Sequence, residues 1–368
     1  MTESHSIRYW FALIISSIVS IFVALIIIGI SWYLLWKFVL IRFGVIRALF
    51  QLNNNDQQPN QQSKPKQNPH RRQQLCTSNE AWYRSLPFRE ISRCWSRILS
   101  VNIYPRSLRN PIYKLFCRIF DADINECEYG PDQLDYYASF GELFRRNLKP
   151  NARPIDKESL IVSPCDGEIL DNGLVTSVEL LNIVIKGVSY TIKDLFQLNR
   201  NEIERLQTKQ CKSSLFYACI YLNPGNYHHF HSPAKWKINE RRHITGELMS
   251  VRPEFIMWIP KLLLLNERVV YLGEYENGLM TQTMIGATNV GSIDVYFDET
   301  LKTNTKLDDY TFRMWKENFP KSKPTYFDKG EPFGEFKLGS CIVVIFEAPS
   351  TFNFVRHSGD KIRVGERL

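Results

Sequence analysis

The feature that most constrains this chain is a long uncharged segment near its start. Residues 9–36 contain no charged side chain, are rich in Ile, Val and Leu, and carry aromatic residues at both ends, among them Trp10 and Trp36. A helix of this length rises about 42 Å, enough to cross a hydrocarbon core of about 30 Å with tilt, and Trp favours the interfaces. A cleaved signal peptide has a shorter apolar region and ends at small residues, which this segment lacks. The sequence therefore predicts a single transmembrane helix over residues 9–36, within a membrane anchor formed by residues 1–50.

Positive charge is concentrated around this anchor. Residues 1–110 contain 14 Lys and Arg against 4 Asp and Glu, although the whole chain has a net charge of only +8. Basic residues beside an apolar span usually meet anionic lipid head groups, each worth about 1 kcal/mol. The charge therefore favours contact with an anionic membrane surface over binding to nucleic acid. Lys37, Arg42 and Arg47 follow the span and only Arg8 precedes it, which by the positive-inside rule indicates a cytoplasmic or matrix position for the C-terminal bulk.

The next two segments differ sharply in composition. Residues 51–74 are dominated by Gln and Asn and contain almost nothing apolar, so they cannot repay the entropy of ordering and are predicted to be a disordered linker. Residues 82–149 carry apolar side chains at helical spacing, interrupted by prolines, and predict several short helices. Aromatic and basic residues alternate in this segment, so some helices are candidates for the membrane surface, although such aromatics are more often ordinary core.

From residue 160 onward the pattern changes to short β-rich runs. They lie at residues 215–222, 269–275, 280–285, 292–297 and 341–347, separated by Gly, Pro and Asn. A chain with 44% hydrophobic residues can bury a large core. We predict an α+β fold in which residues 75–368 form one domain with a mainly antiparallel β-sheet. The eight cysteines show no metal-binding or disulfide spacing and are expected to be mostly buried, reduced thiols.

Three short segments in this β-rich half carry side chains suited to catalysis. Asp166 lies in a Pro/Gly turn, His228 and His231 belong to a cluster of three histidines, and a Gly339–Ser340 step precedes an apolar run. Each has an ordinary alternative: a turn former, a metal site without obvious further ligands, and a tight turn. Because imidazole titrates near neutral pH, general acid–base work suits the histidines better than metal binding.

An Asp, a His and a Ser are together the parts of a nucleophile triad. In such a triad the carboxylate orients the imidazole, and the imidazole takes the proton of the hydroxyl. Ser340 lacks the G-x-S-x-G elbow of many hydrolases, because Leu338 and Ile342 occupy the two glycine positions. A membrane-tethered Ser-His-Asp lipid hydrolase therefore stays an alternative that the residues support only weakly.

Taken together and in this order, the three segments resemble the phosphatidylserine decarboxylase family, specifically its mitochondrial type. The resemblance covers roughly residues 82–350. Further matching stretches lie at residues 137–140, 148–155, 185–190, 266–270 and 286–293.

The resemblance implies a proenzyme that cuts itself once, at the Gly339–Ser340 bond. The products would be a large chain, residues 1–339, and a small chain, residues 340–368, which remain associated. Ser340, activated by His231 with Asp166 behind it, would attack the Gly339 carbonyl, which glycine leaves open to close approach. Elimination would then convert Ser340 into an N-terminal pyruvoyl group.

The resemblance also implies a carboxy-lyase that converts phosphatidylserine into phosphatidylethanolamine and CO2. The pyruvoyl ketone would form a Schiff base with the substrate amine and take up the electron pair that CO2 leaves behind. Neither a dissociable cofactor nor a metal is expected. His228 matches a second family histidine and is the candidate proton donor.

The chain departs from the usual residues of the family at two positions near the predicted site. Cys341 stands where the family usually has Thr, and Cys165 where it usually has Ala; the first leaves open an uncleaved, inactive member that serves as a lipid-binding scaffold. Mitochondrial members imply an inner-membrane anchor with the catalytic domain in the intermembrane space. The basic residues after the span indicate the opposite side, and residues 1–8 are too short and too poor in Arg for a transit peptide.

Overall fold

The computed structural model describes residues 82–175, 182–202, 214–288, 292–305, 314–319, 325–337 and 339–368. All of them belong to the second of two units of the chain, Asn68–Leu368. The predicted anchor at residues 1–50 and linker at residues 51–74 lie outside the described residues. Among the described residues, no helix is both long enough and apolar enough to cross a bilayer. The transmembrane helix over residues 9–36 therefore stays a prediction.

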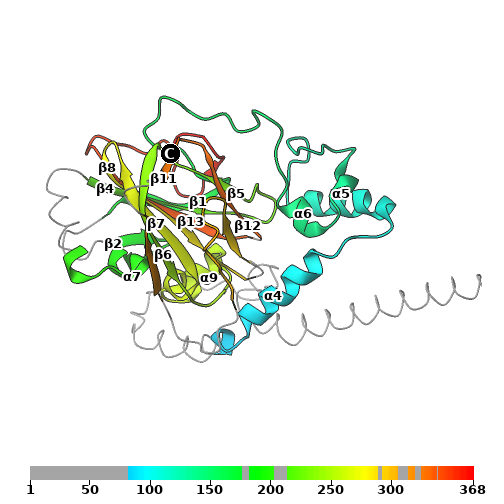
Figure 1. The fold of residues 1–368 in the computed structure, drawn as a ribbon, viewed down its shortest axis with the longest axis horizontal. Coiled ribbons are helices and arrows are strands. Elements are labelled where there is room, and N and C mark those ends of the chain that lie inside the picture. Colours follow the sequence, from blue (N-terminus) through cyan, green and yellow to red (C-terminus); the bar gives the residue numbers. More distant parts are fainter. Residues whose placement is uncertain are drawn as a thin grey trace, which may run out of the picture. The chain divides into compact units, whose positions relative to one another are not determined.

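The segment predicted to be helical contains short helices, which confirms that part of the prediction. They are α4 (Phe88–Leu99), α5 (Arg109–Ile119) and α6 (Phe140–Phe144), with 3-10 turns at Arg106–Leu108 and Leu134–Tyr136. α6 begins at Ser139, whose hydroxyl accepts the Glu142 amide proton and so satisfies a free donor at the helix start. α5 and α6 lie side by side (Figure 1). The rings of Tyr113 in α5 and Phe140 in α6 contact each other, with centres 5.2 Å apart.

The main sheet joins nine of the described strands, and all of its pairings are antiparallel. Eight strands follow in the order β10-β6-β7-β8-β13-β4-β1-β14, and β11 pairs with β6. This confirms the predicted α+β fold with a mainly antiparallel sheet. The strands are β1 (Gly167–Leu174), β4 (Ser214–Tyr221), β6 (Trp236–Ile244), β7 (Arg268–Tyr275), β8 (Gly278–Ile285), β10 (Met314–Asn318), β11 (Thr325–Phe327), β13 (Cys341–Ala348) and β14 (Lys361–Ile362).

β13 lies in the interior of this sheet, between β4 and β8. All eight of its residues are buried, from Cys341 to Ala348. Its run of Ile and Val suits a strand that is covered on both faces, since β-branched side chains fill a pleated surface well. The strands predicted at residues 215–222, 269–275, 280–285 and 341–347 correspond closely to β4, β7, β8 and β13.

A small sheet holds the histidine segment against the main sheet. It consists of β5 (His229–His231), β12 (Pro332–Phe336) and β9 (Ile293–Val295), and β9 is shorter than the strand predicted at residues 292–297. Phe333 of β12 is fully buried, with its ring 6.1 Å from that of Trp236 in β6 and 5.2 Å from that of Tyr271 in β7. These aromatic contacts fix the position of β5 relative to the strands beneath it.

The remaining described elements surround these two sheets. A two-stranded sheet is formed by β2 and β3, and three short helices follow elsewhere in the chain. Their bounds are β2 (Asn182–Ile185), β3 (Val188–Thr191), α7 (Ile192–Phe196), α9 (Pro253–Trp258) and α10 (Leu262–Leu265). Of the six cysteines in the described ranges, Cys94 is exposed and five are buried, and all six are free thiols, as expected.

Candidate active site

The strand register brings the three catalytic segments to one end of the main sheet. Tyr221, the last residue of β4, pairs with Glu168 near the start of β1 and with Cys341 at the start of β13. Asp166 therefore comes just before β1 and Ser340 just before β13, on the two strands that flank β4. The chain leaving β4 at this same end runs through Asn223 into the histidine segment.

Ser340 is completely buried and its hydroxyl is unpaired. Its side-chain oxygen has no hydrogen-bond partner among the described residues, whereas its backbone carbonyl accepts a hydrogen bond from the Leu222 amide at 2.9 Å. Most buried polar atoms in folded proteins are paired, so an unpaired hydroxyl at a predicted catalytic position is consistent with a role in chemistry. The structure thus fixes the backbone of Ser340 and leaves its hydroxyl oxygen free to react.

His231, at the end of β5, has both ring nitrogens engaged. Nδ1 lies 2.9 Å from the Gly330 carbonyl oxygen, and Nε2 lies 3.3 Å from the Tyr227 hydroxyl. A carbonyl can only accept, so Nδ1 carries the proton and Nε2 offers a lone pair to the Tyr227 hydroxyl. Burial lowers the pKa of His231 below its ordinary value of 6.5, so the ring is neutral at neutral pH.

Asp166 is buried and paired with an arginine. The Arg153 guanidinium donates from Nε to Oδ1 at 2.9 Å and from Nη2 to Oδ2 at 2.6 Å, and the Val364 amide donates to Oδ1 at 2.8 Å. No hydrogen bond joins Asp166 to His231 or His231 to Ser340 in the described part of the chain. The strands therefore bring the three residues to one region of the molecule without closing a hydrogen-bonded triad, and their catalytic roles stay predictions.

His228 is also fully buried. Nδ1 donates to the Asn226 carbonyl oxygen at 2.8 Å, whereas Nε2 has no hydrogen-bond partner among the described residues. The Phe144 ring of α6 covers the imidazole, with ring centres 3.9 Å apart. Burial lowers the pKa of His228 to about 3, so the ring is neutral and its Nε2 is an unprotonated acceptor.

Sequence reasoning missed several groups that hold this site. Arg153 binds Asp166, Tyr227 contacts His231, and the Gly330 carbonyl fixes its tautomer. Arg153 lies inside the matching stretch 148–155 and Tyr227 stands beside the histidines, so both could have been singled out as polar residues near the motifs. A backbone carbonyl such as that of Gly330 leaves no signal in a sequence.

Comparisons with known proteins match this chain to one enzyme family. The family model for phosphatidylserine decarboxylase matches residues 140–368. The mitochondrial phosphatidylserine decarboxylase proenzyme of Cricetulus griseus is 40% identical over 309 residues, which cover 78% of this chain and 73% of that protein. The mitochondrial phosphatidylserine decarboxylase proenzyme 1 of Saccharomyces cerevisiae is 31% identical over 427 residues, covering 93% and 83%.

This chain belongs to the phosphatidylserine decarboxylase family. The proenzyme of Plasmodium falciparum is a further relative, 37% identical over 291 residues that cover 78% of this chain and 77% of that protein. The resemblance stated from the three segments is thereby confirmed. The names of these relatives support neither of the two alternatives, a lipid hydrolase or an inactive lipid-binding scaffold. A second family model, described only as a domain of unknown function, matches residues 6–59.

A cavity beside Gly339 gives this family member a route to the predicted cleavage site. The cavity has a volume of about 330 Å³ and is lined by Gly339 together with mainly apolar and aromatic side chains, among them Phe88, Phe144 and Phe255. Because Phe144 also covers His228, the cavity lies next to that histidine. A pocket of this size and composition suits part of an apolar ligand.

We predict that Gly339→Ala slows self-cleavage without unfolding the decarboxylase domain. Among the described residues, a Cβ atom at position 339 would meet the Leu222 carbonyl oxygen alone, at 3.4 Å, so the described fold has room for it. The added methyl group would still crowd the approach to the Gly339 carbonyl carbon, which we expect to slow cleavage on the order of tenfold. Intact mass measured over time gives the rate, and thermal unfolding checks the fold. A variant cleaved at the wild-type rate would show that glycine is not required at this step.

Proposed function

We propose that this chain decarboxylates phosphatidylserine after cutting itself between Gly339 and Ser340. The observation that carries this proposal is the fully buried, unpaired Ser340 hydroxyl at the start of an interior strand, in a chain of the phosphatidylserine decarboxylase family. A buried hydroxyl without a hydrogen bond costs stability. Tyr190 and Thr283 also have one, so what distinguishes Ser340 is its position at the predicted cleavage bond of this family.

Self-cleavage needs a nucleophile, a base and an open carbonyl. The Ser340 oxygen bonds to the Gly339 carbonyl carbon while its proton passes to the base, and the C–N bond then breaks, leaving an ester and a Ser340 amine that takes the proton. Loss of the Ser340 α-proton expels Gly339 as a carboxylate. Water then adds to the remaining unsaturated residue and ammonia leaves, so that Ser340 becomes a pyruvoyl group with its carbon skeleton intact.

His231 is the residue best suited to act as the base. Its Nδ1–H donates to the Gly330 carbonyl, so Nε2 is the ring nitrogen whose lone pair can take the Ser340 proton. The lowered pKa keeps Nε2 unprotonated at neutral pH, so it can take the Ser340 proton once the Tyr227 hydroxyl gives up its hydrogen bond. Asp166 supplies a negative charge that stabilises the imidazolium formed when Nε2 takes the proton.

The surroundings of Ser340 fit a covalent pyruvoyl group. The group would occupy the place of the unpaired Ser340 side chain, and the cavity beside Gly339 gives a substrate access to it. When present, it supplies an electron sink that stabilises the carbanion formed on loss of CO2.

The free Nε2 of His228 can manage a proton during turnover. The amine of phosphatidylserine arrives as an ammonium ion and must lose a proton before it can react as a nucleophile. Nε2 of His228 carries no proton in the neutral ring, so it can accept that one and later return it to carbon. Because burial lowers the pKa of His228, the ring would hold this proton only while the negative charge of the bound substrate stabilises the imidazolium. This order makes His228 an acceptor first and a donor second.

The two chains would remain associated because strands of the small chain pair with strands of the large chain. β13 pairs with β4 on one side and with β8 on the other, and residues of both partners stay in the large chain. The tail that follows also pairs with the large chain. Its contacts are β14 with β1, the Ser163 amide with the Glu366 carbonyl, and the Leu368 amide with the Ile161 carbonyl.

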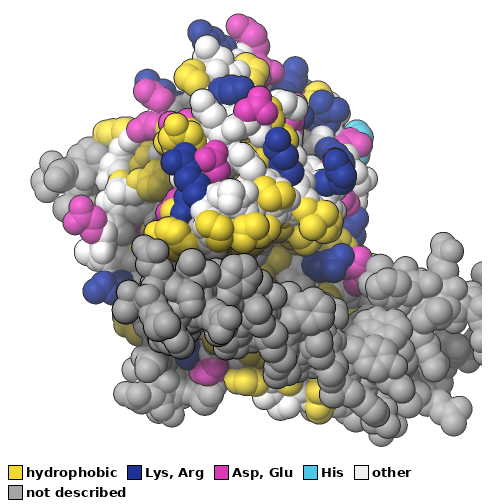
Figure 2. Space-filling view, turned by 90° about the vertical axis from the view of Figure 1, so that its right-hand side faces the viewer, with side chains coloured by type: hydrophobic (Ala, Val, Ile, Leu, Met, Phe, Trp, Pro, Cys, Tyr) yellow, Lys and Arg dark blue, Asp and Glu magenta, His cyan; other side chains and the backbone are white. Residues whose placement is uncertain are grey.

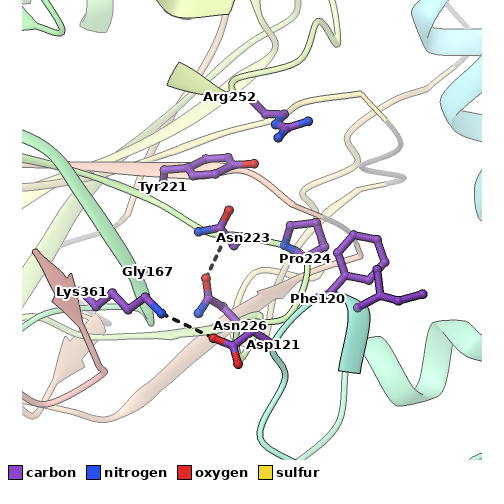
Figure 3. Close-up of a pocket in the computed structure, with 10 residues that line it drawn as sticks. Phe120, Asp121, Gly167, Tyr221, Asn223, Pro224, Asn226, Arg252 and Lys361 are labelled. Atoms are coloured by element: carbon purple, nitrogen blue, oxygen red, sulfur yellow. Dashed lines mark hydrogen bonds and ion pairs between the residues drawn. The ribbon is translucent and has the colours of Figure 1, made fainter. Parts of the chain in front are cut away.

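Among the described residues that line the Gly339 cavity, Arg252 is the one with a cationic side chain. It also lines a neighbouring polar cavity of about 380 Å³, together with Tyr221 and Pro224, which are shared by both cavities (Figure 3). In this second cavity Lys361 pairs with Asp121 at 3.5 Å. Arg252 therefore stands where the phosphate of a phospholipid could meet a positive charge while apolar groups enter beside Gly339.

Exposed apolar side chains make the face that carries α4 and α5 suited to a bilayer. On α4 they are Ile91, Trp95 and Ile98, and on α5 they are Leu115 and Ile119. Figure 2 shows Lys and Arg side chains, with some Asp and Glu, among hydrophobic ones on this face, and the basic side chains could meet anionic lipid head groups. Ile119 and Phe120 also line the polar cavity, so this face continues to the cavity that Arg252 shares.

The location would be the mitochondrial inner membrane, with residues 1–50 as a single-pass anchor, residues 51–74 as a linker and residues 75–368 facing the intermembrane space. Relatives named mitochondrial support the organelle. If this topology is correct, protease added to intact mitochondria spares the domain, and rupture of the outer membrane alone exposes it to digestion. Protection that persists until the inner membrane is opened would place the domain in the matrix, as the basic residues after the span indicate.

We predict that Ser340→Ala abolishes both self-cleavage and decarboxylation, because it removes the nucleophile and the precursor of the pyruvoyl group. Intact mass should show one uncut chain, and labelled phosphatidylserine should yield no phosphatidylethanolamine. Ser358→Ala is the matched control, since Ser358 lies in the same small chain and its hydroxyl contacts only groups away from the site: it donates to the Leu170 carbonyl and accepts from Nζ of Lys186. A Ser340→Ala chain that still forms phosphatidylethanolamine would rule out the pyruvoyl mechanism.

We expect Arg252→Gln to raise KM for phosphatidylserine about tenfold, with self-cleavage unchanged, because one charge-assisted contact to the phosphate is lost. The rise should occur with both vesicles and dispersed short-chain lipid. Arg356→Gln, an equal loss of charge outside both cavities, should leave KM unchanged. Ile98→Asp on α4 should weaken activity on vesicles only. An unaltered KM for Arg252→Gln would remove Arg252 from the substrate site.

A further inference from the structure

A buried arginine is central to the polar contacts around Asp166. Arg153 holds the carboxylate through two nitrogens, Nε and Nη2, and the side chains of both residues are almost completely excluded from solvent, with exposed fractions of 10% and 6%. A fork of this kind fixes the orientation of a carboxylate as well as its distance, which a lysine cannot do. The position of Asp166 is thus set by Arg153 and by the Val364 amide.

The same guanidinium is itself held in place. Its Nη2 also donates to Glu126 at 2.8 Å, and its Nη1 donates to the Ala152 carbonyl at 2.8 Å. Glu126 in turn accepts a hydrogen bond from Arg363 at 2.7 Å. Arg153 is therefore a fixed element of the site, because side chains and backbone constrain the whole of its planar group.

Arg153 also lies over the ring that contacts His231. Its guanidinium carbon is 6.0 Å from the centre of the Tyr227 ring, within the range of a cation–π contact. The His229 ring stacks on Tyr227 as well, with ring centres 4.8 Å apart and an interplanar angle of 4°. These contacts hold the ring, so that its hydroxyl lies 3.3 Å from Nε2 of His231. Burial raises the pKa of Tyr227, which therefore keeps the proton that it donates.

We propose that Arg153 is a positioning residue for self-cleavage, which fixes Asp166 with its fork and, through Tyr227, fixes the ring of His231. The proposal rests on the function proposed above and adds a residue to it. Arg153 makes its contacts with Asp166, Glu126, Tyr227 and the Ala152 carbonyl, and with neither His231 nor Ser340 in the described part of the chain.

The charge of Arg153 also reaches the base. The charged and titratable groups that act on His231 are His229 on the same strand, Asp166 before β1, Arg153, and the Tyr227 phenol at Nε2. Burial is the main cause of the lowered pKa of His231; His229 and Arg153 lower it further, whereas Asp166 raises it. Removal of the Arg153 charge should therefore raise the pKa of His231. As the pH falls, Nε2 of His231 would then be protonated, and lost as a base, at a higher pH than in the wild type.

Two substitutions separate geometry from charge. Arg153→Lys keeps the charge and loses the fork, so we expect self-cleavage to slow on the order of ten- to a hundredfold while the midpoint of its acid limb stays where it is. Arg153→Gln loses both, so cleavage should slow and the acid midpoint should also move to higher pH. The measurement is the rate of small-chain formation by full-length proenzyme from about pH 5 to pH 8, followed by intact mass.

Arg363→Gln is the control, because it removes an arginine from the same network without touching Asp166 or Tyr227, and it should cleave at the wild-type rate. Thermal unfolding of each variant in a Ser340→Ala chain measures stability apart from cleavage. Wild-type rates for both Arg153 variants, an unmoved acid midpoint for Arg153→Gln, or an equal slowing by Arg363→Gln would each overturn the proposal. These outcomes leave the proposed function intact as long as wild-type protein cuts itself and Ser340→Ala does not.

Discussion

The hydrogen bonds of β13 to β4 and β8 are the interaction on which the rest of the site depends. They place Ser340 at the beginning of an interior strand, and the Leu222 amide holds its carbonyl at the end of β4. An interior strand is paired on both edges, so a break in the chain at its first residue costs little of the sheet. A protein that cuts itself at this point keeps its core, because the strand after the cut remains bonded on both sides.

Among the candidate catalytic side chains, two have a buried atom without a hydrogen-bond partner in the described part of the chain: the hydroxyl oxygen of Ser340 and Nε2 of His228. Such atoms destabilise a fold, and natural proteins retain few of them. Their neighbours are by contrast fully engaged, with Asp166 held by Arg153 and Val364, and His231 held by Gly330 and Tyr227. The site therefore combines side chains held by fixed hydrogen bonds with two atoms, on Ser340 and His228, that have no hydrogen-bond partner among the described residues.

Much of this arrangement could be predicted from the sequence. The runs of alternating and β-branched residues indicated β4, β7, β8 and β13, because burial on a pleated surface leaves that signature. Asp166, His228, His231, Gly339 and Ser340 could be chosen because three weak motifs in one order are specific when taken together. Arg153 and Tyr227 were not chosen, since a lone charged or aromatic residue has many ordinary uses. The tautomer of His231 could not be predicted either, because it is set by the Gly330 carbonyl, and every residue has a carbonyl.

The sequence by itself determined the long uncharged, apolar segment at residues 9–36, the α+β character of the chain and the Gly–Ser step that precedes an apolar strand. These are local properties, fixed by the order of apolar and polar side chains. Only the tertiary structure decided which groups contact Asp166 and His231, because Val364 and Gly330 reach them from distant parts of the chain and Arg153 reaches Asp166 across a turn of irregular backbone that no local pattern fixes. The expected Asp–His–Ser chain of hydrogen bonds gave way to an arginine-held carboxylate, since a buried carboxylate is stabilised best by a paired guanidinium and a backbone amide.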